Sequence, residues 1–204
     1  MTANGTRATD ELSEAEVIDV FRRAGAILDG HFILSSGLHS PVFIQKARVF
    51  MYPELTGKLC RALAHKIRAA GLGAIDLIVS PAVGAIVPGY ETARALGVPA
   101  VWVEREGGEF RLRRFEMATG ARVLIVEDVV TTGKSVRETM DAVSSLGATI
   151  VACACLIDRS GGEVALGVPL VALARYKVPA YTADAIPPEM ARIPAVKPGS
   201  RGLA

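Results

Sequence analysis

Residues 123–135 read Val-Leu-Ile-Val-Glu-Asp-Val-Val-Thr-Thr-Gly-Lys-Ser, an apolar run that ends in two acids and a short polar loop. An apolar run of this kind, rich in Val and Ile, is typical of a strand that is buried on both faces of a parallel sheet. Apolar residues at helical spacing follow over 135–146, and Gly147 predicts the end of that helix. The stretch therefore predicts one strand–loop–helix unit of an α/β protein.

The same alternation continues on both sides of this unit. Further buried strands are predicted at 77–79, 100–103, 150–157 and 170–174, and further helices at 53–70 and 84–96. An N-terminal helix is expected between a capping box, Ser13 with Glu16, and the terminating Gly25. Residues 26–50 hold short β-like pieces, 104–116 a charged hairpin, and the chain from about 178 a proline-rich tail expected to lie extended on the surface. This order predicts an α/β fold in which helices flank a mostly parallel sheet.

Composition excludes several classes of protein. Half of the 204 residues are hydrophobic and 22% are charged, which favours a packed core over disorder. The net charge of +2 gives no reason to expect a nucleic acid or an anionic membrane as partner. No apolar run reaches the roughly 18 residues of a membrane span, and the polar N-terminus does not resemble a signal peptide. Three cysteines without a CxxC pair favour a reducing compartment, so the expected location is cytoplasmic.

The loop after the acids has the composition of a phosphate site. A helix N-terminus offers unpaired backbone N–H groups and the positive end of the helix dipole. Gly133 permits a close backbone approach, Thr131, Thr132 and Ser135 add hydroxyl donors, and Lys134 adds positive charge. A Walker A loop is excluded, because the residue five positions before Gly133 is Asp128 rather than glycine.

The two acids, Glu127 and Asp128, would repel a phosphate unless they face another part of the ligand. Carboxylates accept hydrogen bonds from vicinal hydroxyls or from the water shell of Mg²⁺. The pair and the loop together therefore favour a ribose phosphate, with its hydroxyls on the acids. The alternative is purely structural: Ser135 and Glu138 have capping-box spacing, and polar loops follow any parallel strand.

This stretch resembles the phosphoribosyl diphosphate (PRPP) binding signature of the type I phosphoribosyltransferases. Residues 80–86 (SPAVGAI) are similar to that family's diphosphate loop, and residues 30–45 (GHFILSSGLHSPVFIQ) to the substrate hood of its orotate-specific members. Residues 156–162 (LIDRSGG) are similar to their orotate-contacting strand end, and residues 193–201 (IPAVKPGSR) to the C-terminal ending of one branch. From about residue 15 to 201 the chain thus resembles the orotate phosphoribosyltransferases in their shorter, thermophile-type branch.

The resemblance implies one phosphoribosyltransferase domain over residues 1–204. Its core would span about 53–175, and a small hood would combine about 13–50 with the C-terminal tail. The implied reaction transfers the 5-phosphoribosyl group from PRPP to orotate, giving orotidine 5′-monophosphate and diphosphate in pyrimidine (UMP) biosynthesis. No protein nucleophile is needed for such a displacement.

The resemblance also implies roles for individual residues. Arg105 and Asp128 would be catalytic. PRPP would be bound by Arg105 and by the continuous segment Glu127, Asp128, Val129, Val130, Thr131, Thr132, Gly133, Lys134 and Ser135. Orotate would contact Thr131, Arg159 and Phe43, and the diphosphate loop would comprise Ala82, Val83 and Gly84.

Mg²⁺ is the implied cofactor, bound mainly through PRPP, with no protein ligand expected beyond an indirect contact by Asp128. The implied assembly is a homodimer in which the flexible loop 104–116 closes over the partner's site. Longer-loop relatives carry lysine and histidine in this loop, whereas this chain offers four arginines, and which of these acts is open: Arg105, Arg111, Arg113 and Arg114. The lysines of that branch's diphosphate loop and hood are Gly84 and Ser35 here, and Lys46 and Lys134 are the candidates to replace them.

Several alternatives stay open at this point. Arg159 is also interpretable as a surface arginine paired with Asp158, Phe43 as a core residue, and 104–116 as a solvated hairpin. A second enzymatic interpretation is a phosphoribosyltransferase whose substrate is a purine base or uracil instead of orotate. A non-catalytic PRPP-sensing regulator is the interpretation from another class, although the chain has no added nucleic-acid-binding module.

Overall fold

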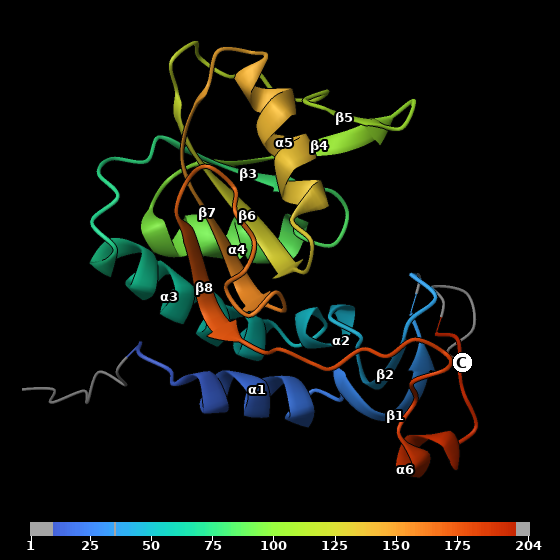
Figure 1. Ribbon diagram of the computed structural model, residues 1–204. Coiled ribbons are helices and arrows are strands. Elements are labelled where there is room, and N and C mark those ends of the chain that lie inside the picture. The colour runs from blue at the N-terminus through green and yellow to red at the C-terminus, as the bar shows by residue number, and fades with distance from the viewer. Residues whose placement is uncertain (1–9, 35, 199–204) are drawn as a thin grey trace, which may run out of the picture.

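The computed structural model describes residues 10–34 and 36–198 and is built around a six-stranded sheet (Figure 1). The strand order is β5-β4-β3-β6-β7-β8. Their bounds are β3 Leu77–Pro81, β4 Ala100–Glu106, β5 Glu109–Arg111, β6 Arg122–Val130, β7 Thr149–Asp158 and β8 Leu170–Arg175. All neighbours are parallel except β5, which returns antiparallel beside β4 at one edge. The predicted α/β class and its five parallel strands are confirmed.

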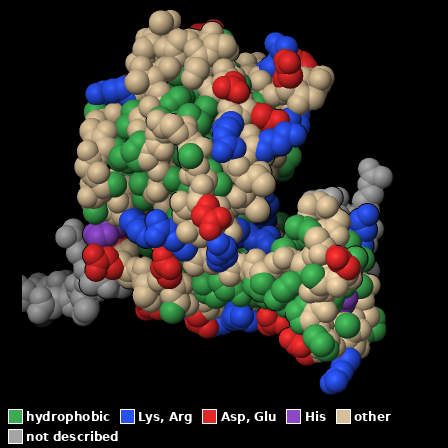
Figure 2. Space-filling view, viewed as in Figure 1, with side chains coloured by type: hydrophobic (Ala, Val, Ile, Leu, Met, Phe, Trp, Pro, Cys, Tyr) green, Lys and Arg blue, Asp and Glu red, His purple; other side chains and the backbone are tan. Residues whose placement is uncertain are grey.

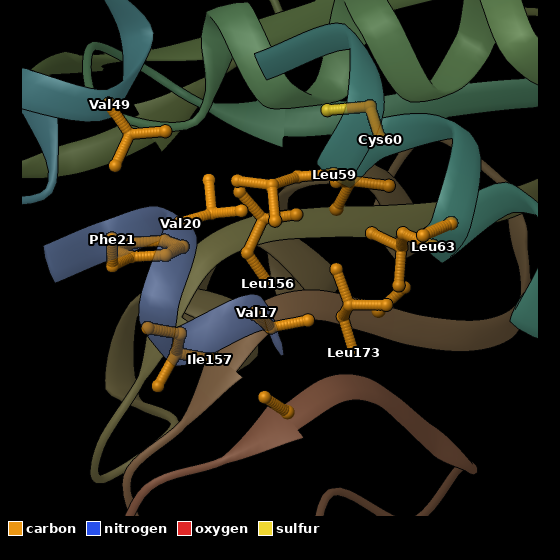
Figure 3. Close-up of a cluster of buried hydrophobic side chains, with 14 of the residues drawn as sticks. Val17, Val20, Phe21, Val49, Leu59, Cys60, Leu63, Leu156, Ile157 and Leu173 are labelled. Carbon is orange, nitrogen blue, oxygen red and sulfur yellow. The ribbon is translucent and has the colours of Figure 1, made fainter. Parts of the chain in front are cut away.

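Helices cover both faces of this sheet. On one face lie α1 (Glu14–Arg23), α3 (Pro53–Ala69) and α4 (Ile86–Leu96), and on the other α5 (Lys134–Ser144). The first face forms a core in which Phe21, Leu63 and Leu156 are fully buried (Figure 3). A second core, with Val123 and Val143, lies beneath α5. Burial on both sides explains why the central strands are continuous apolar runs.

The N-terminal capping box is present as predicted. Ser13 Oγ accepts a hydrogen bond from Glu16 N–H at 3.3 Å, and the Ser13 N–H donates to Glu16 Oε2 at 2.8 Å. Gly25 follows the helix with φ 65°, a left-handed conformation that glycine adopts without strain. The local sequence therefore determines both ends of α1.

A separate two-stranded sheet lies at one end of the molecule. It pairs β1 (Ile27–Ile33) with β2 (His39–Ile44), and the four-residue helix α2 (Ala47–Phe50) follows. The C-terminal segment returns to this sheet through bridges from Phe32 to Val196 and from His39 to Tyr181. This end of the molecule projects beneath the main body in Figure 1.

The sequence predicts an extended C-terminal tail, but this segment is not extended throughout. It contains a short helix, α6 (Pro188–Ala191), whose Met190 is 3% exposed. A helix of four residues is too short to show a 3.6-residue period, so sequence patterning does not reveal it. Among the described residues, no helix combines the length and apolarity that crossing a membrane would require.

Candidate active site

The candidate site lies at the point where the chain reverses the direction in which it adds strands to the sheet. From β3 the chain goes through α4 to β4 on one side and then continues to β6 on the other side. The loops after β3, β6 and β7 therefore converge at the carboxyl edge of the sheet. Ligands of open α/β sheets bind at such a switch point.

The loop after β6 forms a small hollow at the start of α5. Its volume is about 140 Å³, and its lining consists of Glu127 and residues 129–136. Gly133 has φ 74°, and a Cβ at this position would lie 2.8 Å from Val164 Cγ1, so only glycine fits. The N-cap residue Gly133 has no side chain to cap α5, and Thr132 Oγ1 accepts from Lys134 N–H only at 3.4 Å. The capping box, which is the structural alternative for Ser135 and Glu138, is not formed. The uncapped helix end suits a phosphate.

Glu127 and Asp128 are consecutive residues near the carboxyl end of β6, and both are buried, at 7% and 0% exposure. Burial, together with the charge of Asp128, raises the pKa of Glu127 from 4.5 to about 8. Oδ1 of Asp128 accepts from its neighbour's backbone, Val129 N–H, at 2.6 Å, whereas Oδ2 is buried without a partner. A buried acceptor without a donor is costly, and ligand hydroxyls would satisfy it.

An unpredicted ion pair reaches Asp128 from the other end of the molecule. Lys46 Nζ lies 2.6 Å from Asp128 Oδ1. Sequence reasoning had named Lys46 as a possible substitute cation but gave no sign of this pairing, because the two residues are 82 positions apart. Gly84 of the loop after β3 borders the same carboxylate, and the Ala82–Val83 peptide bond of that loop is cis.

Arg159 follows β7 and is more than half buried, which lowers its pKa. Its Nε is buried without a hydrogen-bond partner. The alternative in which Arg159 pairs with Asp158 does not hold, because Asp158 accepts from Ser160 Oγ at 2.6 Å and from the backbone N–H groups of Ser160 and Gly162. Because Asp158 accepts its hydrogen bonds from other groups, the Arg159 guanidinium is suited to bind an anionic ligand.

The two-stranded sheet of β1 and β2 contributes an aromatic residue. Phe43 on β2 is half-buried, and its ring centroid lies 5.7 Å from that of Phe32. Thr131 is exposed at the end of β6. Ser35 of the hood and Arg201 of the tail motif lie outside the described residues.

The segment 104–116 begins with the expected hairpin, formed by β4 and β5 around Gly107 and Gly108. Arg105 points back to its own subunit: it donates to Glu138 Oε2 on α5 at 2.5 Å and to Gly108 O at 2.6 Å. Its guanidinium carbon also lies 4.1 Å from the centre of the Phe110 ring. A cleft of about 660 Å³ runs between this hairpin and α5. No sequence pattern predicts the pairing between Arg105 and Glu138.

In the space-filling view, the surface is indented between the body that carries β5 and α5 and the end formed by β1, β2 and α6 (Figure 2). Lys and Arg side chains lie along this indentation. Among the described residues, no group of three or more His, Cys, Asp or Glu side chains is arranged to hold a metal ion. The carboxylate oxygens of Glu127 and Asp128 nevertheless suit Mg²⁺ that arrives with its ligand and its waters.

A sheet covered on both faces, with an acidic pair and a polar loop before the start of α5 at its switch point, matches the phosphoribosyltransferase class. The model of the phosphoribosyl transferase domain family matches residues 53–166, which is more than half of the chain. Orotate phosphoribosyltransferase 2 of Mesorhizobium japonicum is 67% identical over 188 residues, 92% of this chain and 98% of that one. The orotate phosphoribosyltransferase of Brucella ovis is 64% identical over the same shares.

Solved structures agree with these relatives. The orotate phosphoribosyltransferase of Aeropyrum pernix, 28% identical, superposes with a TM-score of 0.68 and covers 78% of this chain and 93% of its own. That of Mycobacterium tuberculosis, solved with inorganic phosphate, is 23% identical with a TM-score of 0.64 over 79% of this chain and 95% of its own, and supports the fold alone. The chain therefore belongs to the phosphoribosyltransferase family and, within it, to the orotate phosphoribosyltransferases. The resemblance noted in the sequence is confirmed.

Proposed function

We propose that the chain transfers the 5-phosphoribosyl group of PRPP to orotate, releasing diphosphate and forming orotidine 5′-monophosphate, as its relatives' names imply. One observation carries this proposal: a buried acidic pair with an unpartnered oxygen stands directly before an uncapped helix end. Sugar hydroxyls complement the first feature and a 5′-phosphate the second. The step belongs to pyrimidine nucleotide synthesis, and we place it in the cytoplasm.

The PRPP site would use the whole segment from Glu127 to Ser135. The 5′-phosphate would lie in the hollow of residues 129–136, against the first N–H groups of α5. The ribose hydroxyls would donate to Glu127 and to the free Oδ2 of Asp128. The diphosphate would lie along Ala82, Val83 and Gly84, where the loop after β3 borders Asp128.

Orotate would lie between the core and the hood. Arg159 would hold the orotate carboxylate with its fork of donors, Phe43 would stack on the ring, and Thr131 would contact both substrates. We propose that residues 13–50 and the C-terminal tail act as a hood over the core of about 53–175, within one domain. The ion pair from Lys46 to Asp128 supports this arrangement, since it joins the hood to the PRPP loop.

The chemistry would be a displacement at ribose C1. The bond from C1 to the diphosphate oxygen breaks, and its electron pair leaves with the diphosphate. Orotate N1 gives up its proton to the departing diphosphate or to water, and the N1 electron pair forms the new bond to C1. The residues would contribute alignment, stabilisation of the separating charges and exclusion of water. Mg²⁺ that arrives with PRPP would neutralise part of the diphosphate charge, and Glu127 and Asp128 are the residues that would hold it through its waters.

We further propose a homodimer in which the loop 104–116 of one subunit closes over the site of the other. A cationic loop would stabilise the departing diphosphate, and Arg105 is our first candidate for this role. In the single chain Arg105 is held by Glu138, so such a role requires that this pair opens.

The decisive experiment follows orotate absorbance in the presence of PRPP and Mg²⁺. We expect a fall with orotate and PRPP together, and no product when uracil, adenine or hypoxanthine replaces orotate. Product with another base and none with orotate would contradict the proposed substrate. PRPP binding without product from any base would contradict the enzymatic proposal.

A further inference from the structure

The ion pair between Lys46 and Asp128 joins two parts of the molecule. Lys46 stands between β2 and α2, three residues after Phe43, whereas Asp128 belongs to the central strand β6. The Lys46 side chain is 41% exposed and that of Asp128 is fully buried, with 2.6 Å between Nζ and Oδ1. A short contact to a buried carboxylate fixes the orientation of that group far better than a surface pair would.

The orientation of Asp128 is determined on three sides. Oδ1 receives Lys46 Nζ and the Val129 N–H, both at 2.6 Å. Oδ2 points toward Gly84, where a Cβ would lie only 2.5 Å away. One oxygen is therefore held by donors, while the other is unpartnered and buried against Gly84, so it is a free acceptor for a ligand hydroxyl that enters between it and this loop.

Gly84 also makes room for the lysine. A Cβ at position 84 would lie 3.4 Å from Lys46 Nζ, so the ammonium group borders the loop after β3. The segment Ala82–Gly84 itself contains no cationic side chain. The cation closest to this loop and to Asp128 is thus contributed by the hood, not by the loop.

We propose that Lys46 is a positioning residue for PRPP, which acts by fixing the Asp128 carboxylate so that Oδ2 is presented to the ribose. This inference rests on the proposed function. It adds a role for a residue that neither the PRPP loop nor the pyrimidine pocket includes. It also predicts that the hood affects PRPP binding as well as orotate binding.

The test compares Lys46→Met with Lys58→Met, an exposed lysine on α3 that serves as a matched control. Removing a charged hydrogen-bond partner corresponds to about a tenfold or larger effect on binding. We expect Lys46→Met to raise the KM for PRPP, and the Kd of PRPP measured by calorimetry, by about tenfold or more. The orotate KM should change by less than about threefold, and Lys58→Met should leave both values near wild type.

Two further variants of Lys46 and one of Gly84 separate positioning from a structural role. Lys46→Arg keeps a cation within reach and should restore most of the PRPP affinity, whereas Lys46→Gln should not. Gly84→Ala leaves Lys46 in place but crowds Oδ2, and it should weaken PRPP binding in the same direction. If Lys46→Met fails to fold, as seen in its thermal unfolding, the comparison of Lys46→Arg with Lys46→Gln decides.

The inference is overturned if wild type is active and the PRPP affinities of Lys46→Met and Lys58→Met are equal. It is also overturned if Lys46→Met raises both substrate KM values equally and Lys46→Arg does not recover, because a general disturbance of the hood would produce that result. Failure of the proposed function has a different signature, namely that wild type itself binds no PRPP or forms no product.

Discussion

Arg105 and Glu138 form a direct link between the hairpin and helix α5 of the same subunit, with 2.5 Å between Nη2 and Oε2. The side chains are 44% and 30% exposed, so the pair is accessible to solvent. Such an exposed ion pair contributes only about 0–1 kcal/mol to stability. Arg105 can therefore leave Glu138 for an anion of higher charge. In the single chain the hairpin is thus attached to α5 by a weak contact, and diphosphate could take the place of Glu138 in it.

Replacing Glu138 should release Arg105. We expect Glu138→Gln to raise kcat/KM for PRPP severalfold and to change the free energy of unfolding by less than about 1 kcal/mol. Glu109→Gln is the matched control, since Glu109 pairs at 3.0 Å with Arg111 on the same hairpin. Steady-state kinetics at several PRPP concentrations measure the effect. Equal values for the two variants would show that the pair does not restrain the arginine.

Sharing of the loop across a dimer is tested by mixing two inactive variants. Arg105→Ala removes the proposed loop cation, and Asp128→Asn removes a carboxylate of the proposed PRPP site while keeping the size of the side chain. If each site combines residues from both subunits, one of the two sites in a verified heterodimer keeps both native residues, so the heterodimer should recover up to about half of the activity of a wild-type dimer. Heterodimers with no recovered activity would place Arg105 in the site of its own subunit.

Arg159 should affect one substrate far more than the other. Loss of a bidentate contact to a carboxylate predicts that Arg159→Ala raises the orotate KM by about a hundredfold, with a small change for PRPP. Arg159→Lys should recover only part, because an ammonium group lacks the planar fork. Arg175→Ala, at an exposed position on the neighbouring strand β8, is the control. Equal changes in both KM values would contradict the assignment of Arg159 to orotate.

Glu127 should make stability depend on pH. Burial and the charge of Asp128 raise its pKa from 4.5 to about 8, so in this pH window the folded chain carries a proton that the unfolded chain lacks. The contribution of this group to the free energy of unfolding is therefore full below pH 4.5 and is lost as pH rises toward 8. Glu127→Gln, which does not titrate, should become more stable relative to wild type by up to a few kcal/mol over this range.

Urea unfolding at pH 5, 6.5 and 8.5 measures the difference between Glu127→Gln and wild type. The exposed Glu54 on α3 provides the control, since Glu54→Gln should differ from wild type by the same amount at each pH. A difference for Glu127→Gln that stays constant with pH would show that the carboxyl is ionised throughout.

The sequence alone predicted the sheet and its helices, because these elements follow from local patterns. A strand buried on both faces must be apolar throughout, as residues 123–126 are, and a helix must begin and end with residues that satisfy its free N–H and C=O groups. The capping box of α1 and the glycine that begins α5 are local in the same sense. The acidic pair and the polar loop that follows it are contiguous, so the sequence alone also predicted that they belong to one candidate site.

Only the tertiary structure decided which side chains meet across the chain. Lys46 reaches Asp128 over 82 positions, Arg105 reaches Glu138 over 33, and Asp158 turns to its own loop instead of pairing with Arg159. The short helix α6 and its contact with β1 likewise could not be predicted from the spacing of apolar residues. Periodicity reports which face of an element is buried, whereas these pairings depend on strand order and on the path of the loops. Those are fixed only when distant segments pack together.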